Sequence, residues 1–540
     1  MTRFYLITCL LLPFALTAQA DFSSQLPLLV IDTEGDTIVD EPKIMARMGI
    51  VDNGPGNLNR PTDDFNGYEG WVGIEIRGSS SQSFPKKGFG LETREENGDD
   101  LETELLGFPE EEDWVLHGPY SDKSLIRNAL LYDLAGETMA WAPRVRMVEL
   151  VINGNYRGVY LFTERVKRDK NRIDVNKLKD DEIEGDDLTG GYILKFDKFT
   201  GESDDHQTAF LSNYRADTES GQSVPILFHY PKPEDIVAEQ RNYISAWVHD
   251  FEDRLMGPDW LDPVRGYARD VDLESVADMF IYNEISRNVD GYRLSTYFSK
   301  QKDSDGGQLT MGPVWDFNLA FGNADYCRGD EVEGWGYEFS DYCPEDGFQI
   351  PVWWPRLIAD PAVLTLVKER YTTLRMTTLS DEALTGRIDS FVDLMGTAAI
   401  DRNFNRWPVL GERVWPNSFV GDTHAEEIDF LTDWALDRLE WLDGQWLNIN
   451  SVDGPAAADG LRLSIFPNPA GAGATLHVRS PERRLVGYHV EISDALGRTL
   501  LRAKANRPIA TPTTMAAGLY KVAVFDERNQ FVTSKKWVVR

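Results

Sequence analysis

The segment from Asn283 to Gly322 constrains the fold most, because a polar turn joins two short runs that each carry an acidic residue. Asp290 lies between a helix-like run and an alternating, strand-like run, and Asp316 follows a second short strand in the run VWDFN. The turn at 303–307 reads DSDGG, which favours a β-hairpin. Because a hairpin brings its two ends together, we expect both carboxylates to face one pocket.

Two aspartates at the base of a hairpin can hold a magnesium ion and orient a hydroxyl group for phosphoryl transfer. The alternative is a pair of solvated turn aspartates without a chemical role. The residues Asp303, Asp305 and Gly306 in the same turn also suggest a calcium-binding hydrolase. The acidic partners of a calcium loop do not follow at the required spacing, so we interpret this turn as a hairpin tip.

Length and charge narrow the class of protein. The chain has 540 residues, which is enough for two or more domains. The net charge of −34 disfavours nucleic acid and anionic membranes as partners, because both repel a negative surface. The acidic surface suits solubility and divalent cations.

The first residues predict export. Arg3 precedes an apolar run from Phe4 to Ala18, and Ala18-Gln19-Ala20 is typical of a signal-peptide cleavage site. The run is too short to span a membrane comfortably, and no later segment predicts a span. Outside the signal segment, which contains Cys9, the cysteines are Cys327 and Cys343. In an exported protein this pair predicts a disulfide, with two buried thiols as the alternative.

A second candidate site is the serine-rich segment 77–90, RGSSSQSFPKKGFG. A loop of small residues joins two strands, and Lys86 and Lys87 open the second strand. Backbone N–H groups in such a loop can cradle phosphate, and a lysine on the next strand can neutralise it. The spacing of a Walker loop is absent. The alternative is a serine-rich hairpin with a basic edge.

The remaining pattern alternates between strands and helices. Ser121-Asp122 predicts the start of a helix that carries Arg127, either an anion ligand or a surface ion pair. Asn153-Gly154 predicts a hairpin, whose second strand leads to Glu164. Strands are expected at 28–32, 73–77, 145–152, 158–163 and 190–197, and helices at 235–256, 272–287, 361–395 and 424–446.

The C-terminal part differs in character. The segment 448–460 is rich in Gly, Pro and Ala and is typical of a linker. Helical periodicity then disappears, and short strands separated by turns predict a small all-β sandwich. These strands are expected at 462–466, 475–478, 490–492, 519–525 and 531–539.

Six groups of residues, spread over roughly residues 40 to 447, carry a family resemblance. They are Arg77–Ser80 with Phe84–Lys87; Asp122 with Arg127 and Asn128; Asn153–Tyr160 running into Thr163 and Glu164; Gly190–Tyr192; Asn288–Asp290; and Trp315–Gly322. On these residues the chain resembles the CotH kinase family of secreted or spore-coat atypical protein kinases.

The resemblance implies an α+β fold: a divergent, two-lobed protein-kinase-like domain. It implies a loop with Ser79 and Ser80 that covers the phosphates of ATP, with Lys86 or Lys87 reaching them. The strand that ends at Glu164 would lead into the hinge beside adenine.

The resemblance also assigns the chemistry. Asp290 would orient the acceptor hydroxyl and take its proton, Asp316 and Asn318 would hold magnesium, and Arg127 would belong to the nucleotide site. The implied activity is transfer of the γ-phosphate of ATP to a protein hydroxyl, as by a secreted serine/threonine kinase.

The sequence departs from the family pattern in its metal ligands. The family motif is usually WDxD, but its second acid is Asn318 here, and a neutral oxygen binds a metal more weakly than a carboxylate. In ordinary protein kinases an Asn five residues after the catalytic Asp binds the second metal. That place is Ser295, with Asn288 and Asn323 as candidate substitutes. The alternative function is therefore a pseudokinase: a surface structural or adhesion protein without catalysis.

The C-terminal residues resemble the type A sorting domain of type IX secretion. The matching groups are Phe466–Pro469, Asp494–Arg498, Gly518–Tyr520 and Lys535–Val539. The resemblance implies the type IX secretion machinery as a partner and a final location at the cell surface or in the medium. The expected organisation is a signal peptide (1–20), a CotH kinase-like domain (21–447), a linker (448–460) and a sorting domain (461–540).

Overall fold

The computed structural model describes residues 22–199, 207–216, 221–447, 463–466, 468, 470–480, 485–494, 498–526 and 528–539. The expected signal peptide and linker lie outside these residues. Within the described ranges, no helix is both long and apolar enough to cross a membrane. The chain divides into two compact units, one ending at Thr432 and the other beginning at Asp433.

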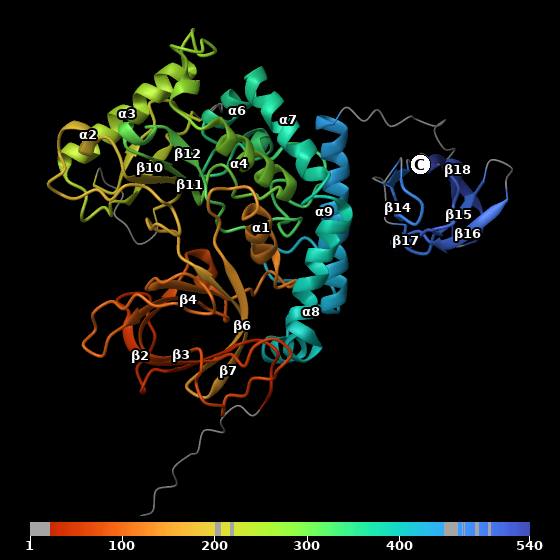
Figure 1. Cartoon of the computed structure of the whole chain (residues 1–540), viewed down its shortest axis with the longest axis horizontal. Coiled ribbons are helices and arrows are strands. Elements are labelled where there is room, and N and C mark those ends of the chain that lie inside the picture. Colours follow the sequence, from red (N-terminus) through yellow and green to blue (C-terminus); the bar gives the residue numbers. More distant parts are fainter. Residues whose placement is uncertain are drawn as a thin grey trace, which may run out of the picture. The chain divides into compact units, whose positions relative to one another are not determined.

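Seven strands of the first unit close into a barrel in the order β1-β2-β3-β4-β5-β7-β6 (Figure 1). All neighbouring pairs are antiparallel except β1 and β6, which are parallel. Alternating apolar side chains fill the barrel with one buried core. The strands are β1 (Leu28–Asp32), β2 (Ile44–Val51), β3 (Tyr68–Arg77), β4 (Gly88–Arg94), β5 (Asp113–His117), β6 (Val145–Ile152) and β7 (Asn155–Glu164).

The turn between β6 and β7 confirms the predicted Asn-Gly hairpin. Asn153 and Gly154 both have positive φ angles, 51° and 71°. This left-handed conformation suits Asn and Gly in a two-residue hairpin. The Asn153 side chain also accepts a hydrogen bond from the Thr33 N–H, which ties the turn to the end of β1.

A second sheet of the first unit has the order β12-β11-β8-β10-β9, and all of its pairs are antiparallel. The β11–β12 hairpin turns at residues 303–305, as the DSDGG pattern predicted. The residues 314–318, where a strand was expected, form a loop instead. The strands are β8 (Tyr192–Phe196), β9 (Ala209–Leu211), β10 (Pro225–Tyr230), β11 (Thr296–Lys300) and β12 (Leu309–Met311).

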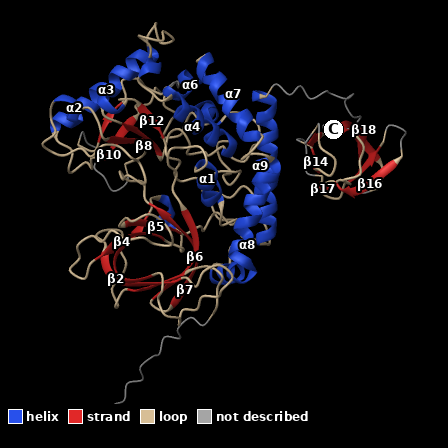
Figure 2. Ribbon diagram, viewed as in Figure 1, coloured by secondary structure: helices blue, strands red, loops and turns tan. Residues whose placement is uncertain are grey.

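Helices surround this second sheet, and Figure 2 shows them in blue beside its red strands. The apolar side chains of α3 and α4 are buried, as their spacing predicted. The helices expected within 361–395 are α7 and α8, and α8 continues to Arg406. The described helices are α1 (Arg127–Ala135), α2 (Gly185–Leu188), α3 (Ala238–Met256), α4 (Leu273–Ser286), α5 (Phe339–Tyr342), α6 (Trp353–Ile358), α7 (Pro361–Arg375), α8 (Asp381–Arg406) and α9 (His424–Trp446).

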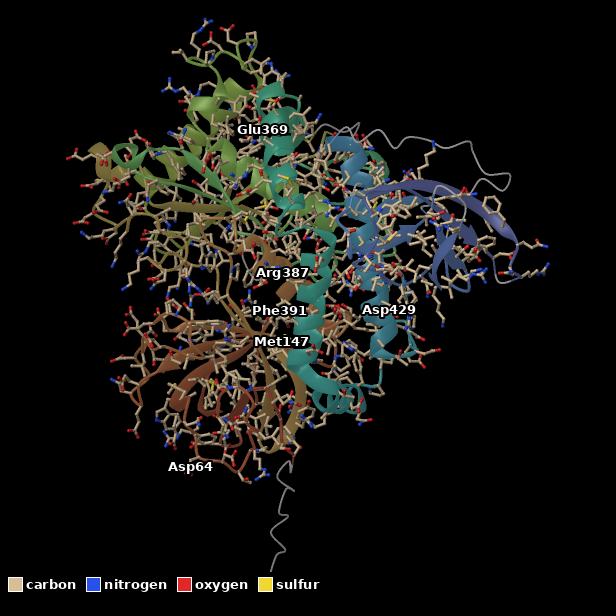
Figure 3. All side chains as sticks on the ribbon, turned by 45° about the vertical axis from the view of Figure 1, so that its right-hand side comes forward. Asp64, Met147, Glu369, Arg387, Phe391 and Asp429 are labelled. Atoms are coloured by element: carbon tan, nitrogen blue, oxygen red, sulfur yellow. A yellow bond between two sulfur atoms is a disulfide. The ribbon has the colours of Figure 1, made fainter. Side chains whose placement is uncertain are left out.

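Helix α8 joins distant parts of the first unit. Its Arg387, labelled in Figure 3, forms ion pairs with Asp133 of α1 and with Glu137. Nearer its C-terminus, Arg402 pairs with the fully buried Glu149 of β6 at 2.6 Å. A buried carboxylate needs such a partner, because an unpaired charge inside a protein is costly.

The second unit contains two sheets, with the orders β13-β14-β17 and β16-β15-β18-β19. Apolar side chains from both sheets form one core, which includes the fully buried Trp537. The strands β16 and β17 were not expected. The strands are β13 (Ser464–Phe466), β14 (Thr475–Arg479), β15 (His489–Ser493), β16 (Thr499–Lys504), β17 (Ile509–Ala510), β18 (Gly518–Phe525) and β19 (Phe531–Val539). The chain therefore combines helices and sheets, in agreement with the α+β prediction.

Cys327 and Cys343 form the predicted disulfide, at a Cα–Cα distance of 5.5 Å. The bond closes a loop with a sequence separation of 16 residues. Asp346, which contacts the candidate site described below, follows this loop closely. The disulfide therefore restricts a segment that lies beside that site.

Replacing both cysteines by serine should lower the free energy of unfolding by about 3 kcal/mol, because a cross-link over a loop of this length restricts the unfolded chain by roughly that amount. Urea denaturation measures the loss. A reducing agent should lower the stability of the native chain equally and leave the double variant unchanged. Equal stability of the oxidised chain and the double variant would contradict this expectation.

Candidate functional site

A cleft of about 280 Å³ lies between the barrel and the second sheet, and both contribute to its walls. The barrel side includes Arg77 and the serine loop with Ser79 and Ser80. The other side includes the two predicted acids, Asp290 and Asp316. The structure thus places the two aspartates and the predicted serine loop around one cleft.

The side chains lining the cleft include one acid that the sequence did not single out, Asp197, directly after β8. The charge of Asp197 helps to raise the pKa values of Asp290 and Asp316. Loss of hydration raises the pKa of Asp290, and the neighbouring Arg293 opposes this shift. The Asp316 side chain is accessible from the cleft, but the surrounding walls limit its hydration. This and the charge of Asp290 raise the pKa of Asp316 to about 6.

The backbone around Asp316 is held by side chains of α1. Asp316 has a positive φ of 64°, a conformation that Asp tolerates better than most residues. Its N–H donates to the Tyr132 hydroxyl at 2.9 Å, and the Phe317 N–H donates to Asn128 Oδ1 at 2.7 Å. These bonds fix the direction in which the Asp316 carboxylate leaves the loop.

Arg127 also binds the loop that follows Asp316, but it does not line the cleft. Its guanidinium is fully buried and donates to Asp122 Oδ1 at 2.6 Å and to the Ala320 carbonyl at 3.0 Å. The expectation of an anion ligand or a surface ion pair is therefore wrong. The helix also begins at Arg127 rather than near Ser121, because the Asp122 carboxylate binds the Ser124 and Arg127 N–H groups just before the first turn.

Arg293 holds Asp290. One of its terminal nitrogens lies 3.2 Å from Asp290 Oδ1, and the other donates to Asp346 Oδ1 at 3.0 Å and to the Phe348 carbonyl at 2.9 Å. The Arg293 side chain is only 2% exposed. Asn288 links the two acidic loops, because its amide donates to the Asp316 carbonyl at 3.3 Å.

The cations that line the cleft are not the predicted lysines. Arg77, Lys195 and Lys198 lie there, and Lys195 pairs with Asp197 at 3.2 Å. Within the described residues, Arg77 and Lys198 form no ion pair, and the Arg77 guanidinium lies over the Trp315 ring at 5.5 Å. Two positive charges are therefore available to an anion in the cleft.

Lys86 and Lys87 do not reach this cleft. The Lys86 ammonium is buried and donates to the Pro119 and Val159 carbonyls at 3.2 and 2.7 Å and to Asn403 Oδ1 at 2.8 Å. Burial lowers its pKa. The Lys87 ammonium donates to the Gln82 carbonyl. The prediction that one of them reaches phosphate is not supported, because both ammonium groups bind backbone carbonyls instead.

Glu164 also lies outside the cleft. Its buried carboxylate binds the Arg144 guanidinium at 2.7 Å and accepts from the Arg144 N–H at 2.9 Å. The neighbouring Thr163 does line the cleft. Of the metal candidates, Asn318 lines the cleft, whereas Asn323 donates to the Asn318 carbonyl at 2.8 Å.

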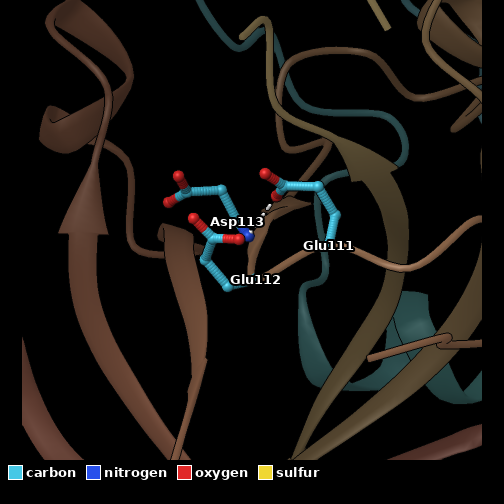
Figure 4. A group of neighbouring side chains, drawn as sticks. All are labelled: Glu111, Glu112 and Asp113. Atoms are coloured by element: carbon cyan, nitrogen blue, oxygen red, sulfur yellow. Dashed lines mark hydrogen bonds between the residues drawn. The ribbon is translucent and has the colours of Figure 1, made fainter. Parts of the chain in front are cut away.

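A compact acidic triad, Glu111, Glu112 and Asp113, lies elsewhere (Figure 4). It is the only group of three or more His, Cys, Asp or Glu residues, among those described, whose ligand atoms all lie within 4.8 Å of one another. Lys167 pairs with all three carboxylates, and Arg172 pairs with Glu111 at 3.2 Å. Arg165 also pairs with Asp113 at 3.2 Å. Three cations therefore contact the three carboxylates, and we interpret the triad as a structural ion network.

Comparison with known proteins identifies the family of this chain. The family model described as CotH kinase protein matches residues 74–442, so the chain belongs to the CotH kinase family. The comparison with curated proteins gave no match.

One solved structure that resembles part of the chain is PorZ, an essential surface component of the type IX secretion system of Porphyromonas gingivalis. The two chains are 22% identical, with a TM-score of 0.13. The similarity covers 17% of this chain and 12% of the PorZ chain.

Substitutions of Lys86 and Arg77 should have different effects, the first on stability and the second on ATP binding. Lys86→Met should lower the free energy of unfolding by about 2–4 kcal/mol, because it leaves buried acceptors without a charged donor, and it should not change nucleotide affinity of the folded protein. Arg77→Gln should weaken ATP binding with little loss of stability. Urea denaturation and isothermal titration with ATP measure the two effects. Normal stability and weak ATP binding of the Lys86→Met protein would contradict this interpretation and indicate that Lys86 contacts the nucleotide.

The raised pKa of Asp316, about 6, predicts a pH dependence. Below this pH the carboxyl is neutral, so Mg²⁺ affinity should fall about tenfold per pH unit. Calorimetric titration with Mg²⁺ at several pH values measures this slope. Asp316→Asn should bind weakly at every pH in this range. A flat wild-type profile through pH 6 would contradict the assignment of Asp316 as a ligand.

The raised pKa of Asp316 also affects stability: the same rise in pH that strengthens Mg²⁺ binding should destabilise the metal-free protein. A carboxyl with a raised pKa favours the folded state most below its unfolded value of 3.8, and that contribution is lost as the pH rises through about 6. Above this pH, Asp316→Asn should therefore raise the melting temperature of the metal-free protein. Differential scanning calorimetry measures the change.

Proposed function

We propose that this chain is a secreted, kinase-like phosphotransferase that moves the γ-phosphate of ATP to a protein hydroxyl group. The observation that carries the proposal is the convergence of Asp290 and Asp316 on one cleft that also contains Arg77 and Lys198, which form no ion pair with any described residue. Carboxylates for a metal and cations for phosphate are the two requirements of phosphoryl transfer.

Magnesium fits the residues in the cleft. Asp316 provides a carboxylate oxygen and Asn318 an amide oxygen, both of which are ligands of this hard cation. The charge of Asp290 raises the pKa of Asp316, and a cation nearby would relieve this repulsion. When bound, the metal would neutralise negative charge on the phosphates.

Asp290 would act as the base. Its carboxylate accepts the proton of the acceptor hydroxyl while that oxygen bonds to the γ-phosphorus, and the bond from phosphorus to the β-phosphate bridging oxygen breaks to release ADP. Loss of hydration, which raises its pKa, makes Asp290 a better proton acceptor. Arg293 keeps its carboxylate in place. Arg77 and Lys198 would bind phosphate oxygens, and the loop with Ser79 and Ser80 would cover them.

The proposal extends to the organisation of the chain. The barrel and the second sheet with its helices would be the two lobes of a divergent kinase fold, with residues 21–447 as one domain. The C-terminal strands would form a β-sandwich that the type IX secretion machinery recognises, after a signal peptide at 1–20 has directed export. The disulfide supports an oxidising destination.

A second candidate function is an exported scaffold without catalysis. Asn318, in the place of the second acid of the WDxD motif, favours it, because a neutral ligand holds magnesium less tightly. This candidate predicts no nucleotide-induced change in melting temperature and no phosphate transfer with any divalent metal.

Asp290→Ala should lower phosphate transfer by about 10²–10⁴-fold, the usual contribution of a general base, without loss of folding. Transfer of radiolabel from ATP to casein, or to the chain itself, measures the rate. Asp64→Ala is the matched control, because Asp64 is an exposed aspartate of the barrel unit (Figure 3). Equal rates for both variants, or no label with any divalent metal, would contradict the proposal.

A further inference from the structure

A second pocket, of about 240 Å³, lies next to the cleft. Its walls are mainly apolar side chains of the segment after β8, of β9, of the start of β10 and of the segment after the disulfide loop. They are Phe199, Leu211, Val224, Pro225 and Phe348. The mechanism proposed above gives this pocket no role.

The pocket shares a wall residue with the candidate active site. Asp197 lines both cavities. Arg293 lines the second pocket and lies 3.2 Å from Asp290 Oδ1. Arg293 therefore lies between the proposed base, Asp290, and the apolar residues of the pocket.

The walls are joined by hydrogen bonds before any ligand is present. Gln222 donates to the Gly347 carbonyl and accepts from the Gln349 N–H at 2.8 Å. Gln349 also donates to the Cys343 carbonyl at 3.0 Å, which attaches the wall to the disulfide. A preformed pocket loses little entropy when it is filled.

We propose that this pocket binds an apolar side chain, aliphatic or aromatic, of the acceptor polypeptide, one or two residues from the phosphorylated hydroxyl. The spacing follows because successive side chains on one side of an extended chain lie about 7 Å apart. The proposal rests on the proposed phosphotransfer, and it defines the substrate class as polypeptides with an apolar residue beside the acceptor Ser or Thr.

The test uses the whole chain and a set of short peptides with a single Ser. Each peptide carries Leu, Phe, Ala or Lys at one of the two positions on either side of that Ser. At one position, Leu and Phe should give a kcat/KM at least about tenfold above Ala, because burying a whole apolar side chain is worth that much. The difference should lie mainly in KM. Equal values for all peptides would overturn the pocket while leaving the proposed phosphotransfer intact.

Two matched variants locate the effect. Leu211→Lys places a charge in the pocket wall, and Leu261→Lys changes a leucine that does not line it; both leucines are 50% exposed. Leu211→Lys should lower the value for the Leu peptide to that of the Ala peptide, without changing the KM for ATP. Leu261→Lys should have no effect. An equal response to both variants, or none to Leu211→Lys, would overturn the assignment.

A binding measurement separates this proposal from the proposed function. Fluorescence polarisation of the labelled peptides requires no transfer of phosphate. If no peptide is phosphorylated but the Leu peptide binds at least about tenfold more tightly than the Ala peptide, and Leu211→Lys removes that difference, the phosphotransfer fails and the pocket stands. If neither transfer nor binding distinguishes the peptides, the pocket is overturned.

Discussion

The bonds from α1 to the backbone of residues 316–321 determine the chemistry available in the cleft. Asn128, Tyr132 and the buried Arg127 together hold this loop in a conformation that includes a left-handed residue. Asp316 lies at that left-handed position, and its carboxylate reaches the cleft because the loop cannot relax. Arg127 supports this loop without lining the cleft, which explains how a residue of the family resemblance can lie outside the cleft.

The charges in the cleft lie close together without forming a complete set of ion pairs. Burial and the charges of Asp290 and Asp197 raise the pKa of Asp316, while Arg77 and Lys198 form no ion pair with any described residue. In a closed, ligand-free protein this arrangement costs stability, whereas the acidic triad at 111–113 is fully compensated by Lys167, Arg165 and Arg172. The paired charges around the triad are therefore interpreted as stabilising the fold, and the charges of the cleft as binding a ligand.

Local patterns predicted many helices and strands but missed β2, β5, β9 and β10, and they predicted the side-chain partners poorly. The Asn-Gly turn, the hairpin at 303–307 and the convergence of Asp290 and Asp316 followed from short-range geometry. The roles of Lys86 and Glu164 could not be predicted, because a polar residue beside a loop has the same local pattern whether it faces a ligand or a buried carbonyl group. Asp197 and Arg77 could have been proposed as strand-end residues, but their approach to the cleft depends on how the two sheets meet.

The contact between Lys86 and Asn403 has a practical consequence for dividing this protein. An ammonium group near the start of β4 depends on an amide from α8, more than three hundred positions later in the chain. A fragment that contains only the barrel would keep the buried cation and lose one of its three acceptors. The N-terminal strands are therefore not an autonomous module, and recombinant pieces or chimaeras should retain everything through α8 to remain soluble.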